Sequence, residues 1–223
     1  MAASTLRIET DGGPVSGLWL KPAKATACLV LAHGAGAGMT HKAMVAVAEG
    51  LADRGVATLR FQFPYMEHGS RRPDAPPVAQ AAVRAACGEA MRLAKGLPLY
   101  AGGRSFGGRM TSQAQAAAPL PQVRGLVFFA FPLHLAGKPA VTRADHLRDV
   151  NIPMLLLQGT RDALAELPLL QQVVSGLGER AKLVLAPDAD HSFHVPARVA
   201  RASGRNDAGV LAALLDTAAA WMT

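Results

Sequence analysis

Cysteine and long apolar stretches are both scarce in this chain. Only Cys28 and Cys87 occur among 223 residues, too few for a disulfide framework, and each lies in an apolar segment, so we expect two buried, reduced thiols. The longest apolar runs, such as 27–32 and 126–131, are about six residues, far short of the roughly 20 that a membrane-spanning helix requires. The first residues show no basic stretch leading into an apolar segment, so we expect no signal peptide, no membrane partner and a cytoplasmic location.

Acidic residues are also in the minority, with 16 against 23 lysines and arginines, a net charge of +7 and a pI of about 10.0. The basic residues are scattered, with no run longer than Arg71–Arg72 and no interleaved aromatics, so the pattern favours a diffuse surface charge over specific nucleic-acid binding. The seven histidines are dispersed, and neither His-Glu-x-x-His nor paired Cys-x-x-Cys occurs. We therefore expect no metal and no cofactor.

Short β-like runs alternate with longer helical stretches, which is typical of an α/β fold. No repeat or linker interrupts the pattern, so we expect one domain over residues 1–223. The predicted strands are 5–9 and 15–21, an antiparallel hairpin at the sheet edge, and then 27–32, 56–61, 97–102, 123–131, 153–159 and 181–186. The predicted helices are 41–54, 78–95, 106–118, 164–177 and 206–221. Residues 62–75 form a loop more than twice as long as the usual βα connection, and 132–150 are irregular with at most one short helix.

The segment 103–107 matches the pattern Gly-x-Ser-x-Gly, with Ser105 at its centre. It lies between a predicted strand and a predicted helix, where a serine nucleophile is exposed on a tight turn. Strand and helix backbones crowd such a turn, so the positions two residues on either side need glycine, and Gly103 and Gly107 meet that need. A glycine-rich turn without catalytic function is the alternative interpretation of this pattern alone.

A serine hydroxyl needs a base to remove its proton, and the base needs a carboxylate to orient it. His191 follows the last predicted strand and is the candidate base, with His194, further from the strand end, as the rival. Asp162 follows the strand 153–159 and is the candidate carboxylate; its alternative role is to cap a helix that begins at Ala163. The chain order Ser105, Asp162, His191 is that of α/β hydrolases and differs from those of chymotrypsin and subtilisin.

A developing oxyanion needs backbone N–H donors. Phe106, directly after the serine, supplies one candidate, and Ala35, or as second choice Gly34, supplies the other from the glycine-rich segment 33–38. A dinucleotide-binding loop does not fit this segment, because Met39 occupies the position of the third glycine.

Three further residues are candidates for substrate binding: Arg104, which adjoins the serine, and Arg60 and Tyr65, which lie where a strand leaves on the active-site side. We hypothesise that Arg104 contacts an acidic or polar substrate. The competing interpretation gives the nearby charges a structural role, with an ion pair between Arg109 and Glu67 that fixes the long loop.

With these motifs, the chain resembles small single-domain α/β hydrolases related to dienelactone hydrolases. The resemblance rests on segments 33–38, 60–67, 73–74 and 102–109 and covers nearly the whole chain. It implies an eight-stranded, mostly parallel sheet with helices on both faces, no large cap domain and a cofactor-independent serine triad. Dienelactone hydrolases proper carry cysteine at the nucleophile position, so their substrate is not transferred. A hydrolase-like subunit of a eukaryotic chromatin-modifying complex is also similar.

The sequence therefore predicts a serine hydrolase that cleaves a small ester, thioester or related acyl substrate through an acyl-enzyme. The alternative is a hydrolase-fold interaction module with a vestigial or closed site. The oligomeric state stays open.

Overall fold

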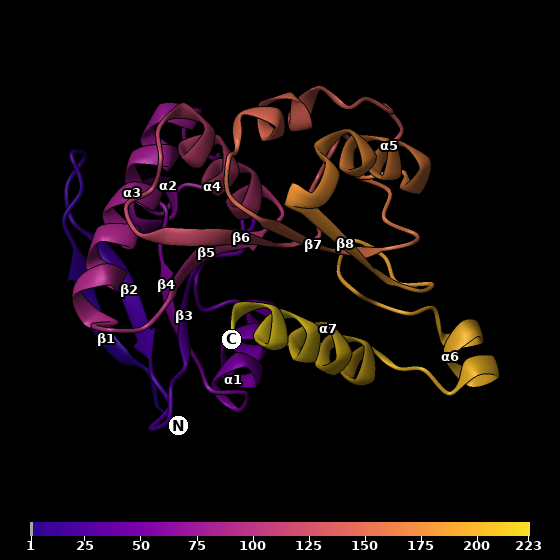
Figure 1. Cartoon of the computed structure of the whole chain (residues 1–223), viewed down its shortest axis with the longest axis horizontal. Helices are drawn as coiled ribbons and strands as arrows, with labels where there is room; N and C mark the ends of the chain where they lie inside the picture. Colours follow the sequence, from indigo (N-terminus) through magenta and orange to yellow (C-terminus); the bar gives the residue numbers. More distant parts are fainter. Residues whose placement is uncertain (1) are drawn as a thin grey trace.

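Strands built from nearly continuous apolar residues form the centre of one eight-stranded sheet, in a computed structural model that describes residues 2–223 (Figure 1). The strand order is β1-β2-β4-β3-β5-β6-β7-β8. β2 pairs antiparallel with β1 and β4, and all other pairs are parallel. The predicted edge hairpin and mostly parallel sheet are confirmed. The strands are β1 (Ser4–Ile8), β2 (Val15–Leu20), β3 (Ala27–Ala32), β4 (Val56–Phe61), β5 (Leu99–Arg104), β6 (Val123–Phe129), β7 (Met154–Gly159) and β8 (Ala181–Ala186).

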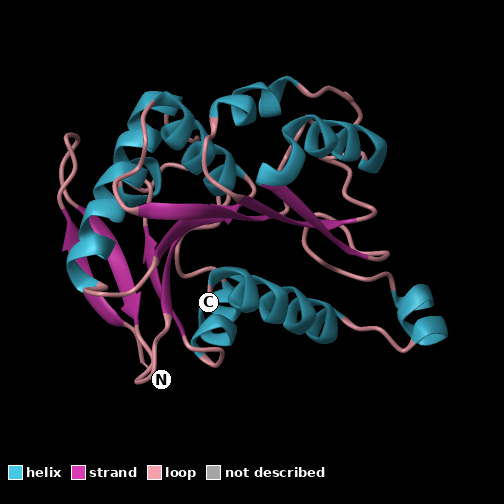
Figure 2. Cartoon of the chain, viewed as in Figure 1, coloured by secondary structure: helices cyan, strands magenta, loops and turns pink. Residues whose placement is uncertain are grey.

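Helices cover both faces of the sheet, because successive strand residues point to opposite faces and both faces are apolar (Figure 2). One face packs against α2 (Pro64–Glu67), α3 (Pro76–Leu93), α4 (Phe106–Ala117), the 3-10 helix η1 (Thr142–Asp149) and α5 (Leu167–Leu177). The other face packs against α1 (Lys42–Ala52) and α7 (Asp207–Met222). The short elements η2 (Gly178–Arg180) and α6 (Ala197–Ser203) bury no residue.

Several boundaries differ from the sequence prediction by one to three residues, among them the end of β6, which was predicted at residue 131 and lies at Phe129. β5 begins two residues later, since Leu97 donates its N–H to Ala94 in a turn that includes the positive φ of Gly96, and it continues to Arg104. α5 begins at Leu167 because the preceding residues form a turn around Asp162. The short helix α2 lies in the segment predicted as a loop, and α6 lies in a segment to which no helix or strand was assigned. Apolar periodicity cannot reveal helices of four and seven residues, because they present no extended buried face.

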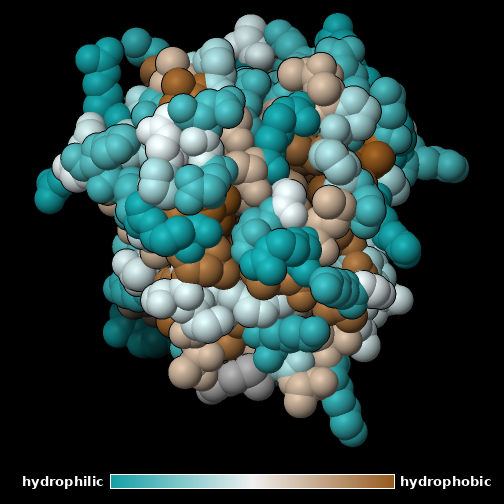
Figure 3. Space-filling view, turned by 90° about the vertical axis from the view of Figure 1, so that its left-hand side faces the viewer, coloured by the Kyte–Doolittle hydropathy of each residue, from teal (hydrophilic) through white to brown (hydrophobic). Residues whose placement is uncertain are grey.

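Both cysteines are buried and free, as predicted, and burial raises the pKa of each thiol to about 12. Among residues 2–223, no helix is both long and apolar enough to cross a bilayer. Figure 3 views the molecule from the side of β1 and β2, where hydrophilic residues cover much of the surface and hydrophobic residues show between them.

Gly107 is required by packing and provides a stability test. A Cβ at this position would overlap the backbone of Ala32 and His33, which belong to the buried centre of the sheet and its adjoining loop. We expect Gly107→Val to lower the free energy of unfolding by about 3 kcal/mol, measured by urea denaturation. A Cβ at Gly88, on α3, would meet no side chain and no other element within 4 Å, so Gly88→Ala should raise stability by about 0.5–1 kcal/mol. Equal effects of the two substitutions would contradict the packing argument.

Candidate active site

Ser105 lies in a sharp turn between the end of β5 and the start of α4. Its backbone has φ 50° and ψ −117°, a conformation that L residues rarely adopt and that indicates local strain. The turn is fixed on two sides: Ser105 donates its N–H to Phe129 of β6 at 3.1 Å, and Gly103 and Gly107 allow the backbone of residues 32–33 to approach. The sequence-predicted elbow is therefore present, with its side chain half-buried at the carboxyl edge of the sheet.

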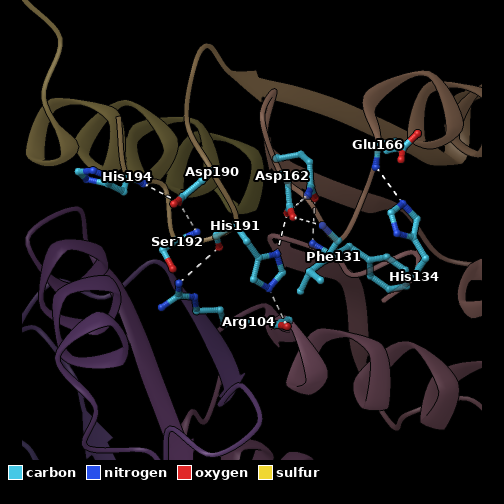
Figure 4. Close-up of polar contacts among 12 residues, drawn as sticks. Arg104, Phe131, His134, Asp162, Glu166, Asp190, His191, Ser192 and His194 are labelled. Carbon is cyan, nitrogen blue, oxygen red and sulfur yellow. Dashed lines mark hydrogen bonds and ion pairs between the residues drawn. The ribbon is translucent and has the colours of Figure 1, made fainter. Parts of the chain in front are cut away.

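Hydrogen bonds join three of the predicted site residues, although 86 positions separate Ser105 from His191. Figure 4 shows the His191 ring between Asp162 and the start of α4. His191 Nε2 is 2.9 Å from Ser105 Oγ, and His191 Nδ1 is 2.7 Å from Asp162 Oδ2. Each residue follows the end of a different strand, and the parallel strands end at the same edge of the sheet. With the Nδ1 proton shared with the carboxylate, Nε2 is free to accept the serine proton.

Asp162 is oriented by neighbours that the sequence analysis did not single out. Its side chain is 0% exposed, its Oδ1 accepts from the Leu164 N–H at 2.8 Å, and its Oδ2 accepts from Gln158 Nε2 at 2.5 Å. The Gln158 amide in turn accepts from the Phe131 N–H at 2.9 Å. The helix-capping alternative is wrong, because Glu166 precedes the first residue of α5. A fully buried glutamine at the end of an otherwise apolar strand was the available signal for Gln158.

The loop after β8 presents His191 and turns His194 away. Asp190 Oδ1 accepts from the N–H groups of Ser192 at 2.7 Å and His194 at 3.0 Å, which closes a tight turn around His191. His194 instead bonds Asp207 at the start of α7 at 2.8 Å, and its side chain is 58% exposed. The hydrogen bond to Asp207 raises the pKa of His194. Of the two candidate bases, only His191 reaches the serine.

The glycine-rich loop after β3 lies against the elbow. A Cβ at Gly34 would lie 3.8 Å from the Ser105 Cβ, so the two backbones are close. The N–H of Gly36 donates to the Tyr65 hydroxyl at 3.1 Å. Within residues 2–223, the N–H groups of Ala35 and Phe106 have no hydrogen-bond acceptor. These two amides are thus available to a ligand, which is what the predicted oxyanion-binding role requires.

His33, at the start of this loop, is buried and neutral. Its Nδ1 is 2.8 Å from the Gly34 carbonyl, and its Nε2 accepts from the Phe63 N–H at 3.1 Å, so the ring joins the loop to the segment that leads into α2. Burial lowers the pKa of His33 from 6.5 to about 4.

The depressed pKa of His33 predicts acid destabilisation. Between pH 6.5 and about 4 the unfolded chain binds a proton that the folded chain excludes. The contribution of neutral His33 to the free energy of unfolding is therefore complete above pH 6.5 and is lost as the pH falls. We expect protonation of His33 to lower the free energy of unfolding by up to about 3 kcal/mol. Burial also lowers the pKa of His146 to about 4, so protonation of this group further destabilises the folded protein at low pH.

Urea denaturation at pH 7.5 and 4.5 measures this effect. The loss of stability between the two values should be smaller in His33→Asn than in the wild type, with Asn replacing exposed His68 as the control. Equal pH dependence in all three proteins would contradict the assignment.

Arg60 and Arg104, predicted to bind substrate, are not brought to the serine. Both point to the sheet face covered by α1 and α7, because residues next to each other in a strand alternate. Arg60 is 4% exposed and donates to the Met39 carbonyl at 3.0 Å. Arg104 extends toward Ser192, away from the His191 ring, with Nη2 3.4 Å from the His191 carbonyl (Figure 4). Burial lowers the pKa of both guanidinium groups. Direct substrate contact by these side chains is therefore not supported.

Tyr65 is the substrate-binding candidate that does adjoin the site. Besides its contact with Gly36, its ring packs against His33 and Phe106, with centroids 6.0 and 6.4 Å apart. The residue is 4% exposed, and burial raises the pKa of its hydroxyl. Asp74 accepts from the Tyr65 N–H at 3.0 Å, so the long loop is anchored to α2.

The predicted ion pair between Arg109 and Glu67 is wrong. Glu67 instead pairs with Arg7 at 2.5 Å and accepts from the N–H and hydroxyl of Ser16 at 3.0 and 2.9 Å. Glu67 therefore fixes α2 to the β1–β2 hairpin. Arg109 has no acidic partner among the described residues.

A second serine–histidine contact lies outside this site. Ser112 Oγ is 2.7 Å from His146 Nε2, which connects α4 to η1. Ser112 is buried in the middle of a helix and also bonds the Arg109 carbonyl at 2.9 Å. No strained turn and no free amides accompany it, so the contact stabilises packing. Residues 2–223 also contain no group of three histidine, cysteine or acidic side chains arranged to hold a metal ion.

Comparison with known proteins agrees with the fold. Residues 25–223 match the model of a family described as an alpha/beta hydrolase domain. A serine hydrolase without a lid from Xanthomonas campestris is 21% identical, with a TM-score of 0.77 and coverage of 100% of this chain and 96% of that one. Here too the segment between β6 and β7 holds only η1, which confirms the expected lack of a large cap.

Two other solved structures are similar at low sequence identity. A dienelactone hydrolase from Anabaena variabilis is 22% identical, with a TM-score of 0.75 and coverage of 98% and 95%. An alpha-beta serine hydrolase homologue from Coxiella burnetii is 18% identical, with a TM-score of 0.77 and coverage of 100% and 99%. The predicted resemblance is confirmed at the level of the fold.

Proposed function

Because this chain belongs to the alpha/beta hydrolase family, we propose that it is a serine hydrolase that cleaves a small ester, thioester or related acyl substrate. The single observation that carries the proposal is the continuous hydrogen-bonded line from Asp162 through His191 to Ser105. A vestigial site would not need to maintain the hydrogen bonds of a buried carboxylate with its glutamine partner, nor a serine in a strained backbone conformation.

Acylation proceeds in two proton-coupled steps. Ser105 Oγ attacks the substrate carbonyl carbon while His191 Nε2 takes the hydroxyl proton, and Asp162 stabilises the imidazolium that forms. The N–H groups of Ala35 and Phe106 bind the oxyanion of the tetrahedral intermediate. When the intermediate collapses, the alcohol or thiol leaves with the proton from His191, and the acyl group remains as an ester on Ser105.

Water completes the cycle through the same groups. His191 removes a proton from a water molecule as its oxygen attacks the acyl-enzyme, and the second intermediate expels Ser105, which recovers its proton. The products are a carboxylic acid and the free enzyme. The open, lid-free edge of the sheet supports a small substrate that enters directly from solvent.

Hydrolysis of 4-nitrophenyl acetate, butyrate and octanoate tests this proposal. The wild type should release 4-nitrophenol from at least one ester, and His191→Ala should reduce kcat by about 10³-fold or more. His194→Ala is the matched control, since this exposed histidine pairs with Asp207, and it should leave kcat within about threefold. Loss of activity in His194→Ala with retention in His191→Ala would overturn the assignment of the base.

A further inference from the structure

Arg109 is a half-buried cation without a counter-ion. Its Nε is buried and has no hydrogen-bond partner, and no described acidic side chain pairs with the guanidinium. Removal of a charged group from water without compensating hydrogen bonds is costly. Arg7 and Arg54 avoid this cost through ion pairs with Glu67 and Asp216. Arg60 also has a buried Nε without a partner, but it donates from Nη1 to the Met39 carbonyl. The environment of Arg109 therefore lacks a negative group.

A second arginine increases the local positive charge. Arg143, in the first turn of η1, donates from Nη1 to the His134 carbonyl at 3.1 Å and likewise has no ion-pair partner among residues 2–223. It lies close enough that, together with burial, it lowers the pKa of Arg109. The contact between Ser112 and His146 keeps η1, and with it Arg143, packed on α4. Two like charges are thus held near each other, and no described carboxylate pairs with either of them.

Arg109 lies close to the nucleophile along α4. Arg109 donates its backbone N–H to the Ser105 carbonyl at 3.1 Å, one helical turn after the nucleophile. Its guanidinium carbon lies 5.9 Å from the centre of the Phe106 ring, whose backbone N–H is an oxyanion donor in the proposed reaction. Arg143 is supplied by the segment that leaves β6 at the same edge of the sheet.

We propose that Arg109 and Arg143 form an anion subsite that binds a carboxylate or phosphate group of the substrate, separate from the ester or thioester group that is cleaved. Planar guanidinium groups bind these anions through paired hydrogen bonds, and a bound anion neutralises the positive charge of the two arginines. The inference rests on the proposed function and narrows its substrate class to acyl compounds that carry an additional acidic group.

Two esters of equal chain length test the subsite: the 4-nitrophenyl half-ester of glutaric acid, which is anionic, and 4-nitrophenyl pentanoate, which is neutral. The measured quantity is the ratio of their kcat/KM values, corrected for spontaneous hydrolysis. Arg109→Gln should lower this ratio about tenfold or more, and Arg143→Gln should lower it in the same direction. Arg124→Gln is the matched control, because exposed Arg124 lies at the opposite end of β6 and its loss changes the net charge equally.

A ratio that is unchanged in both variants would overturn the subsite, even if the two rates fall together, since equal losses indicate a structural role. A ratio that falls equally in Arg124→Gln would also overturn it, because the effect would then follow net charge. If Arg109→Gln does not fold, Arg109→Lys and Arg143→Gln provide the same comparison.

A binding measurement separates this inference from the proposed activity. In a Ser105→Ala background, sodium glutarate or inorganic phosphate at ten times its Kd should raise Tm by about 3 °C. Arg109→Gln should abolish the shift, and Arg124→Gln should retain it. Glutarate and phosphate in separate titrations distinguish a carboxylate site from a phosphate site. No shift with either anion, or a shift that survives Arg109→Gln, would overturn the subsite, whereas a wild type inactive on every ester would contradict only the hydrolase proposal.

Discussion

Replacing Ser105 with alanine should lower kcat for ester hydrolysis by at least about 10³-fold. The substitution removes the oxygen that His191 Nε2 contacts, at 2.9 Å, and leaves the oxyanion donors in place, so a low residual rate is expected. Alanine tolerates the positive φ of this turn no worse than serine, so Tm and the far-ultraviolet circular dichroism should stay close to the wild type. Steady-state kinetics with the best of the three 4-nitrophenyl esters measures the effect.

Ser112→Ala is the control for this prediction. Ser112 also contacts a histidine, His146, but in the middle of a helix and without free amides nearby. We expect its kcat within about threefold of the wild type, with a modest loss of stability. If Ser112→Ala abolished activity while Ser105→Ala preserved it, the nucleophile would be assigned to the wrong serine.

Asp162→Asn should reduce kcat by about 10³- to 10⁴-fold, the range seen when a triad carboxylate becomes an amide. Asp162 accepts three hydrogen bonds, from His191, Gln158 and the Leu164 N–H. An asparagine presents an N–H₂ group to one of these donors, so either the ring of His191 adopts the wrong tautomer or a buried donor loses its acceptor. The kcat should therefore fall, and the free energy of unfolding should fall by about 1–3 kcal/mol.

Asp207→Asn provides the comparison, because it changes the other histidine–aspartate pair of the same loop region. His194 and Asp207 are both more than half exposed, and their hydrogen bond lies outside the line to Ser105. We expect kcat in Asp207→Asn to remain near the wild-type value. A larger loss in Asp207→Asn than in Asp162→Asn would exclude Asp162 as the orienting carboxylate.

The sequence predicted the catalytic candidates because each lies directly after a β-like run. Parallel strands end at one edge of a sheet, so a serine, an aspartate and a histidine at three strand ends are brought together by the topology alone. The glycines of segment 103–107 added the local geometry. The strand-end positions and the glycine pattern depend only on residue type and on order along the chain, and both can be read from a single sequence.

The roles of the arginines could not be read in the same way. Arg104 adjoins Ser105 in sequence, yet it belongs to the end of β5, where alternation directs its side chain to the face of α1 and α7. The ion-pair partner of Glu67 could not be predicted either. Glu67 pairs with Arg7 and not with Arg109 because α2 lies beside the β1–β2 hairpin. Charge pairing across elements follows tertiary geometry, which spacing along the chain does not specify.

The contacts of the supporting residues could not be predicted for a related reason. Gln158 and His33 look like isolated polar residues at the ends of apolar strands. Their importance comes from the partners that packing supplies: Asp162 and Phe131 for the glutamine, and Gly34 and Phe63 for the histidine. A buried polar residue in an apolar strand indicates that some partner exists, and only the folded structure identifies it.

Intact-protein mass spectrometry after treatment with a fluorophosphonate tests the central claim most directly, because the reagent phosphonylates only a serine that is activated by its base and open to solvent. The wild type should gain the mass of one adduct, and neither Ser105→Ala nor His191→Ala should gain it. Folded wild-type protein that takes up no adduct, or a Ser105→Ala variant that still does, would contradict the assignment of Ser105 as the activated nucleophile.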